Sequence, residues 1–133
     1  MADPGGGAAH GPIRVLLADD DEGFLASLET LIDGQPELTV VGAVGDGLAA
    51  IELADRLDPD ACVLDLHMPL LDGVTAAARL RFDHPSICLI ALTGDDDPQL
   101  HEAVHAAGAD AVLLKSDLVE ALVKRLGSVR ARL

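Results

Sequence analysis

Acidic side chains, one hydroxyl and one lysine stand at the ends of apolar segments, and together they could transfer a phosphoryl group. The run Asp19–Asp21 follows the first such segment, Asp65 ends the third, Thr93 the fourth and Lys115 the fifth. Carboxylates gathered at one edge repel each other unless a cation neutralises them, and hard oxygen ligands suit Mg²⁺. A metal ion, a lysine and a hydroxyl can hold phosphoryl charge, and a carboxylate can itself be the nucleophile.

Each of these residues taken alone has a simpler structural explanation. An Asp after a strand is often only a helix cap, a Thr there is usually structural, and a lone Lys is usually a solvated charge. Residues of these types at the carboxyl ends of four different strands are hard to attribute to chance. We therefore interpret them as one site.

The elements that must position these residues are short and alternate along the chain. Five apolar segments rich in branched residues predict buried strands. They are Ile13–Ala18, Leu38–Val44, Ala61–Leu66, Ile87–Leu92 and Ala111–Leu114. Between and after them come five helical patterns: Phe24 to Ile32, a helix capped by Asp46 that reaches Leu57, about Val74 to Phe82, Asp97–Pro98 to Ala107 with Gly108 ending it, and a last helix capped by Asp117.

This alternation predicts an α/β domain with a single doubly wound, five-stranded parallel sheet and five helices. Function gathers at the carboxyl ends of the strands in such sheets. The chain of 133 residues is long enough for one domain, and its 50% hydrophobic and 24% charged residues are typical of a globular protein.

The net charge of the chain limits the kinds of partner that it can bind directly. A formal net charge of −14 argues against direct contact with nucleic acid or an anionic membrane. We interpret the basic residues near the end of the chain as helix-end residues: Lys124, Arg125, Arg130 and Arg132. No apolar run approaches the roughly 18 residues that a membrane span needs. Cys62 and Cys88 are expected to be buried, inert thiols, and the chain is expected in the cytoplasm.

Four segments carry a resemblance to a known family. They are Val15–Asp20, Leu64–Gly73 with the pattern D-x-x-M-P-x-x-D-G, Ala91–Thr93 and Leu113–Lys115. Over about Ile13 to Leu126 the chain resembles the receiver domains of bacterial two-component response regulators. The resemblance implies a flavodoxin-like receiver fold over residues 13–127, preceded by a disordered tail over 1–12 and followed by a helix end or linker over 128–133.

The resemblance also implies the chemistry. Asp65 matches the phosphoacceptor, which receives a phosphoryl group from the phosphohistidine of a sensor histidine kinase. Asp19 and Asp20 match the acidic pair that holds Mg²⁺ together with Asp65 and the backbone carbonyl of His67. The chain would then be a switch in transcription regulation rather than an enzyme, although it would catalyse its own phosphoryl transfer and slow dephosphorylation.

Further residues match the switching machinery. Thr93 matches the hydroxyl that moves to bond the phosphoryl group, and Lys115 matches the lysine that pairs with it. Pro69 and Gly73 match turn residues after the third strand. His67 and Asp95 hold positions that tune phosphoryl lifetime in this family.

Two positions depart from the family pattern. Val112 stands where receivers often carry a Tyr or Phe that swings inward, so coupling through an aromatic rotamer is in doubt. Ser116 replaces a common Pro, as in some regulators of the LuxR/NarL type. The expected output is a changed surface on the fourth helix, fifth strand and fifth helix, for an effector, another partner or a homodimer. Whether the chain is a single-domain regulator or part of a DNA-binding regulator stays open.

Three other interpretations compete. His101–His105 matches the zinc-protease pattern H-E-x-x-H, but an amphipathic helix explains the same segment. A haloacid-dehalogenase-type phosphatase could use Asp19, Asp21, Thr93 and Lys115, yet it leaves Leu64–Gly73 unexplained. A pseudo-receiver that is never phosphorylated would not need the complete set of site residues.

Overall fold

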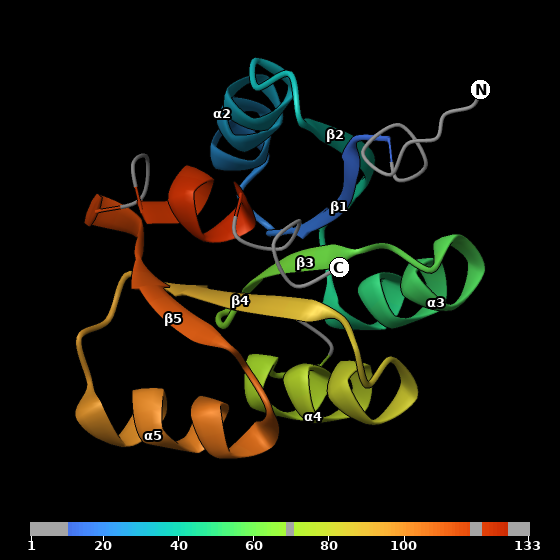
Figure 1. The fold of residues 1–133 in the computed structure, drawn as a ribbon. Coiled ribbons are helices and arrows are strands. Elements are labelled where there is room, and N and C mark those ends of the chain that lie inside the picture. The colour runs from blue at the N-terminus through green and yellow to red at the C-terminus, as the bar shows by residue number, and fades with distance from the viewer. Residues whose placement is uncertain (1–10, 69–70, 118–120, 128–133) are drawn as a thin grey trace.

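Five parallel strands form one sheet in the computed structural model, which describes residues 11–68, 71–117 and 121–127 (Figure 1). The strands are β1 (Ile13–Ala18), β2 (Leu38–Val44), β3 (Ala61–Asp65), β4 (Cys88–Thr93) and β5 (Ala111–Leu114). Their spatial order is β2-β1-β3-β4-β5, and all neighbours run parallel. The predicted sheet is confirmed. Its strand order changes direction between β1 and β3, where sheets of this kind bind ligands.

The helices form one layer on each face of the sheet (Figure 1). They are α2 (Glu22–Asp33), α3 (Gly47–Leu57), α4 (Gly73–Asp83), α5 (Pro98–Ala107) and residues 121–127, with a 3₁₀ turn η1 (Lys115–Asp117). α2 and residues 121–127 cover one face, while α3, α4 and α5 cover the other. None of these described helices is both long and apolar enough to cross a membrane.

Alternate residues of each strand supply the two cores. On β1, Leu16 packs into the core under α3 and α4, whereas Val15 and Leu17 pack into the core under α2. All three side chains are fully buried. A strand covered on both faces buries side chains in both cores, so β1 is apolar apart from Arg14 and shows no polar alternation.

The two cysteines belong to opposite faces of the sheet. Cys62 lies in the core under α3, α4 and α5, and Cys88 lies in the core under α2. Both side chains are buried. Burial, reinforced by the neighbouring Cys88, raises the pKa of the Cys62 thiol to about 12, so it stays protonated at neutral pH. The expectation that both thiols are buried is confirmed.

Aspartate side chains begin four helices. Asp21, Asp46, Asp72 and Asp97 each accept a hydrogen bond from a backbone N–H of the first turn. The predicted caps Asp46 and Asp97 are therefore confirmed. Gly108 ends α5 with φ 120°, a conformation that strongly favours glycine, as predicted.

Some element boundaries differ from the predicted ones by one residue. β3 ends at Asp65 rather than Leu66, although the Leu66 N–H still donates to Leu92 O, so one ladder hydrogen bond continues past the end of the strand. α4 begins at Gly73 instead of Val74 because Asp72 caps it. The predictions for Pro69, for residues 1–10 and 128–133, and for capping by Asp117 lie outside the described residues and side chains.

Gly73 allows α4 to approach the end of β3, and we expect Gly73→Ala to destabilise the fold. An added Cβ would lie 2.5 Å from Leu66 Cα and 2.9 Å from Leu66 O, both backbone atoms. The overlap should cost about 1–3 kcal/mol in urea unfolding. Gly23→Ala in α2 is the matched control, because its Cβ would meet only the Asp21 side chain at 3.5 Å. Equal stability of the two variants would contradict the close-approach explanation.

Candidate functional site

Three carboxylates meet at the carboxyl ends of β1 and β3. β1 and β3 are neighbours in the sheet, with Ala18 paired to Leu64, so the residues that follow both strands come together. Asp19, Asp20 and Asp65 each offer an oxygen, and these oxygens lie within 4.8 Å of one another. Asp19 and Asp65 are buried, while Asp20 is exposed. The structure thus brings these three residues together, as the sequence predicted.

Lys115 supplies the positive charge at this acidic cluster. Its Nζ lies 2.9 Å from Asp19 Oδ2 and 3.6 Å from Asp65 Oδ2. Burial alone would lower the pKa of Lys115, but its hydrogen bond to Asp19 and the charges of Asp65 and Asp19 outweigh burial and raise it. The ammonium group therefore stays charged at neutral pH and partly neutralises the carboxylates.

The protonation of Asp65 depends on opposing effects. Burial raises the pKa of its carboxyl group, and the negative charges of Asp19 and Asp20 act in the same direction. The His67 N–H, which donates to Asp65 Oδ1 at 3.2 Å, and the Lys115 ammonium lower it, but the net shift is upward. An additional cation at the cluster would favour the ionised, nucleophilic form.

The donor set of the cluster fits a divalent metal ion. Asp19 Oδ2 is buried, and among the described residues its partner is the Lys115 ammonium, 2.9 Å away. A buried carboxylate oxygen with open coordination positions, next to two further carboxylates, suits a hard cation such as Mg²⁺. Among the described residues this is the one group of three or more potential metal ligands.

Thr93 ends β4 beside this cluster and is fully buried. Its Oγ1 accepts a hydrogen bond from the Asp95 N–H at 2.9 Å and lies 3.1 Å from His67 Nε2. The hydroxyl is thus held by the loop after β4 and by the exposed His67 side chain. Val112 is half-buried and packs against the core under α5.

Phe24 is a site residue that the sequence analysis missed. The Lys115 ammonium lies 4.4 Å from the centroid of its ring, on the first turn of α2. The sequence shows only that Phe24 is one of two aromatic residues. No spacing signal connects residue 24 with residue 115, because α2 and the end of β5 meet only in the folded domain.

The competing motifs find no support in the geometry. In the H-E-x-x-H segment, His101 Nε2 lies 3.1 Å from Asp95 O and His105 Nδ1 lies 3.1 Å from Ala109 O, so both rings have backbone partners. Asp21, which the phosphatase interpretation needs at the site, is exposed and caps α2 through Phe24 N–H. The described residues therefore favour the set that includes Asp65.

The fold and the site together define a receiver-type phosphoryl-transfer domain, and comparison with known proteins agrees. The family model described as the response regulator receiver domain matches residues 15–127. The chain therefore belongs to the receiver domain family of two-component response regulators. The phosphatase and pseudo-receiver alternatives are not favoured.

Similar proteins carry this domain in different settings. The chain is 37% identical over 105 residues to protein-glutamate methylesterase/protein-glutamine glutaminase 4 of Myxococcus xanthus, covering 78% of this chain and 30% of that protein. It is 34% identical to the nitrate/nitrite response regulator protein NarL of Escherichia coli, covering 90% and 56%. The isolated REC domain of RcsB from Salmonella enterica, solved with the phosphomimetic BeF₃⁻, superposes with a TM-score of 0.83 at 27% identity, covering 91% and 90%. The chain thus spans about a third to a half of these two full-length relatives.

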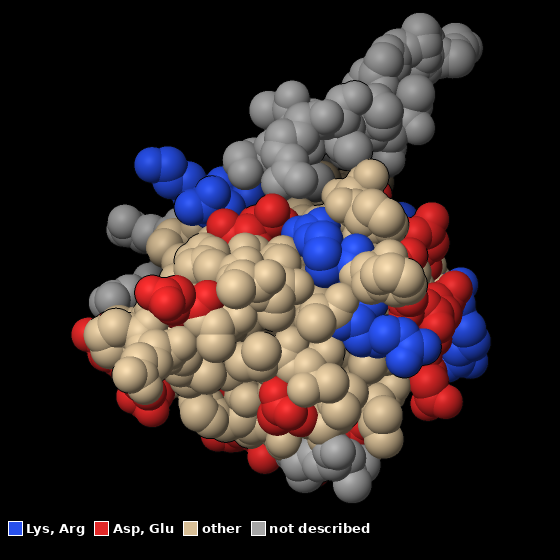
Figure 2. All heavy atoms as spheres, turned by 90° about the horizontal axis from the view of Figure 1, so that it is seen from below, with Lys and Arg blue, Asp and Glu red and all other residues tan. Residues whose placement is uncertain are grey.

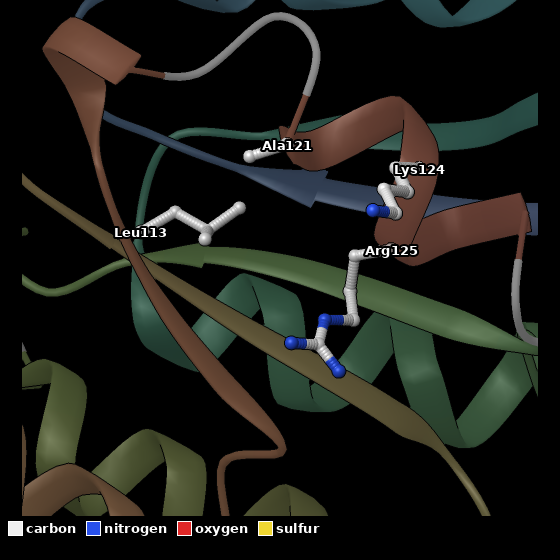
Figure 3. A pocket seen from close by; sticks show the side chains of 4 residues that line it. All are labelled: Leu113, Ala121, Lys124 and Arg125. Carbon is white, nitrogen blue, oxygen red and sulfur yellow. The ribbon is translucent and has the colours of Figure 1, made fainter.

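A second hollow lies between β5 and the helical residues 121–127. Leu113 extends from β5, and Ala121, Lys124 and Arg125 line it from the helix (Figure 3). None of the described residues that line it carries a carboxylate, and none belongs to the acidic cluster. Lys124 and Arg125 are exposed and lie towards the end of the described helical segment, where we interpreted them as helix-end residues.

Basic side chains on the opposite layer are paired with acids. On the face formed by α4 and α5, much of the surface is uncharged and the basic groups lie in separate places next to acidic ones (Figure 2). Arg79 pairs with Asp83, and Arg81 pairs with Asp110, each at 2.7 Å. Such pairing leaves these two arginines poorly suited to bind a phosphate backbone.

Removal of the Asp65 charge should stabilise the metal-free fold at neutral pH. Since the folded pKa of Asp65 is raised above its ordinary value of 3.8, the carboxyl group contributes most stability when protonated, and loses that contribution as pH rises through the raised pKa. We expect Asp65→Asn to raise the urea midpoint at pH 7.5 in the presence of a chelator, with a smaller gain near pH 4.

The control for this experiment is Glu52→Gln, an exposed position on α3. It measures how much the urea midpoint rises when any one negative charge is removed from an acidic chain. A gain for Asp65→Asn that equals this control, or that grows towards pH 4, would contradict the raised pKa.

Proposed function

We propose that Asp65 accepts a phosphoryl group from the phosphohistidine of a sensor histidine kinase and that this modification switches a partner-binding surface. The single observation that carries the proposal is the convergence of Asp19, Asp20 and Asp65, with Lys115 paired to Asp19 and Asp65. Four residues from the ends of three strands would not share one charged pocket if each were only a cap or a solvated side chain.

The proposed cofactor is Mg²⁺, held by Asp19, Asp20, Asp65 and the backbone carbonyl of His67. When bound, it would neutralise the phosphoryl oxygens and lower the repulsion between the phosphodonor and the acidic pocket. The buried Oδ2 of Asp19, whose partner among the described residues is the Lys115 ammonium, supports this assignment.

The transfer follows from the chain's own groups. A carboxylate oxygen of Asp65 attacks phosphorus, an O–P bond forms, and the P–N bond to the donor imidazole breaks with its electron pair staying on nitrogen. Lys115, 3.6 Å from Asp65 Oδ2, is placed to pair with a phosphoryl oxygen. Thr93 would give up its hydrogen bonds with Asp95 and His67 and donate its hydroxyl to a second phosphoryl oxygen.

The switch would reach the surface through the elements that hold Thr93. Asp95 lies in the loop before α5, and its carbonyl is 3.1 Å from His101 Nε2 on that helix. Movement of Thr93 would therefore disturb a loop anchored to α5. We propose that the surface of α5, β5 and residues 121–127 is the one that changes, without help from an aromatic side chain at Val112.

His67 and Asp95 are proposed to tune phosphoryl lifetime. Both are exposed at the mouth of the site, and both contact Thr93 through His67 Nε2 and the Asp95 backbone. The water that hydrolyses an aspartyl phosphate would have to approach past these side chains.

The setting of the domain is proposed from its relatives. The identity to NarL and the Ser116 substitution favour a cytoplasmic transcription regulator of the LuxR/NarL type, with a homodimer or an attached effector domain as the output. The similarity to a methylesterase makes control of an enzymatic domain the second candidate. In either case this domain would be the phosphoacceptor rather than the effector.

Incubation with acetyl phosphate and Mg²⁺ should add one phosphoryl group to the wild-type chain, measured by intact mass. Hydroxylamine should remove it, since an acyl phosphate is attacked readily, and a chelator should prevent its formation. Asp65→Asn should take up none. Asp21→Asn is the matched control because Asn caps helices as well as Asp does, and it should be modified like wild type.

Two other outcomes would contradict this proposal. Release of phosphate from many monoesters, lost in Asp21→Asn but kept in Asp65→Asn, would favour the phosphatase. Stabilisation by Mg²⁺ without any increase in mass would favour the pseudo-receiver.

Removal of the His67 side chain should strengthen binding of the phosphomimetic BeF₃⁻. Thr93 must give up its contact with His67 Nε2 to reach the bound group, and one such hydrogen bond corresponds to roughly a two- to tenfold change in affinity. Titration calorimetry of His67→Ala with BeF₃⁻ and Mg²⁺ measures this change. His84→Ala, whose ring pairs with Asp55 on α3 and does not contact Thr93 or Asp95, is the control. Unchanged or weaker binding by His67→Ala would refute the competition.

A further inference from the structure

We propose that Phe24 is a positioning residue for Lys115, whose ammonium group the ring holds beside Asp65 while a metal ion occupies the carboxylates. The inference rests on the proposed function, because it concerns the lysine that would face the phosphoryl group. Its basis is the distance of 4.4 Å between Lys115 Nζ and the ring centroid, which is within the range of a cation–π interaction.

Local hydrogen bonds fix the place of this ring. The Phe24 N–H donates to Asp21 Oδ1 at 3.1 Å, and the Asp21 N–H donates to Asp19 Oδ1 at 2.9 Å. One short segment therefore holds a carboxylate of the cluster, the start of α2 and the ring. Lys115 directly follows β5, so the contact connects the side of the pocket formed by α2 with the side formed by the end of β5.

The composition of the chain makes this aromatic residue unusual. Of the two phenylalanines, Phe82 is 83% exposed on α4, and the chain has no Tyr or Trp. Phe24 is half-buried and packs against a core built from aliphatic side chains. A leucine would offer similar apolar contact at this position. What only the aromatic ring adds is a negative face for the ammonium group.

The charges of the pocket explain why the ammonium needs such a partner. A divalent cation on Asp19 competes with Lys115 for the oxygen that is now 2.9 Å from Nζ, and it repels the ammonium. The Lys115 side chain is 25% exposed, so water is the alternative location for its charge. The ring of Phe24 attracts the ammonium without using any carboxylate oxygen and so keeps it close to Asp65.

Phosphorylation rates test this role. With acetyl phosphate at saturating Mg²⁺, Phe24→Leu should react roughly two- to thirtyfold more slowly than wild type, the range that cation–π energies allow. Phe24→Tyr keeps the ring face and should react like wild type. Phe82→Leu, on the outer surface of α4, is the control for loss of a phenylalanine and should also react like wild type.

A double-mutant cycle separates this role from packing. In a Lys115→Ala background, Phe24→Leu should cause no further slowing, because the partner of the ring is gone. An equal slowing in both backgrounds, or no slowing by Phe24→Leu, would overturn the proposal. If Phe24→Leu fails to fold, fluorinated phenylalanines at position 24 provide the test, since they keep the ring's shape but weaken its negative face, and they should slow the reaction stepwise.

The wild-type measurement distinguishes the two proposals. If wild-type chain takes up no phosphoryl group, the proposed function fails and the role of Phe24 falls with it. If wild type is phosphorylated on Asp65 but the cycle shows no coupling between Phe24 and Lys115, only the role of Phe24 is refuted.

Discussion

The repulsion between buried carboxylates at the end of β1 and β3 is the constraint on which the site depends. Asp19 and Asp65 are almost fully removed from water, and their charges are tolerable only if a cation stands between them. Lys115 provides part of that compensation from the end of β5. The negative charge that Lys115 leaves uncompensated makes the pocket receptive to a divalent cation, and burial together with this charge raises the pKa of Asp65.

The rest of the domain can be understood as a scaffold for this charge balance. The parallel sheet brings the ends of β1, β3, β4 and β5 to one edge, and the two apolar cores hold those strands in register. Aspartate caps start the helices that leave the same edge, so Asp21 and Asp72 are explained by helix geometry rather than by chemistry. A site built on strand ends is held more rigidly than one built on loops, which suits a reaction governed by the placement of charges.

Thr93 and Lys115 show how this balance could become a switch. Each is held by partners that it would have to share with an incoming phosphoryl group: Asp95 and His67 for the hydroxyl, Asp19 and Asp65 for the ammonium. New negative charge on Asp65 would compete for both. With Val112 in place of an aromatic residue, the hydrogen bonds around Asp95 offer the physical connection between the pocket and α5.

The sequence by itself determined the strands, the bounds of the described helices to within about two residues, and the residues of the cluster, because apolar runs, caps and the D-x-x-M-P-x-x-D-G pattern are local signals. The alternation does not fix the order of the strands, and only the tertiary structure shows that β1 lies between β2 and β3. Only the tertiary structure decided that Asp21 is a cap turned to the surface, that His67 touches Thr93, and that the ring of Phe24 lies against Lys115. Those facts depend on side-chain directions and on contacts between elements distant in the chain, which the spacing of residues along a sequence does not encode.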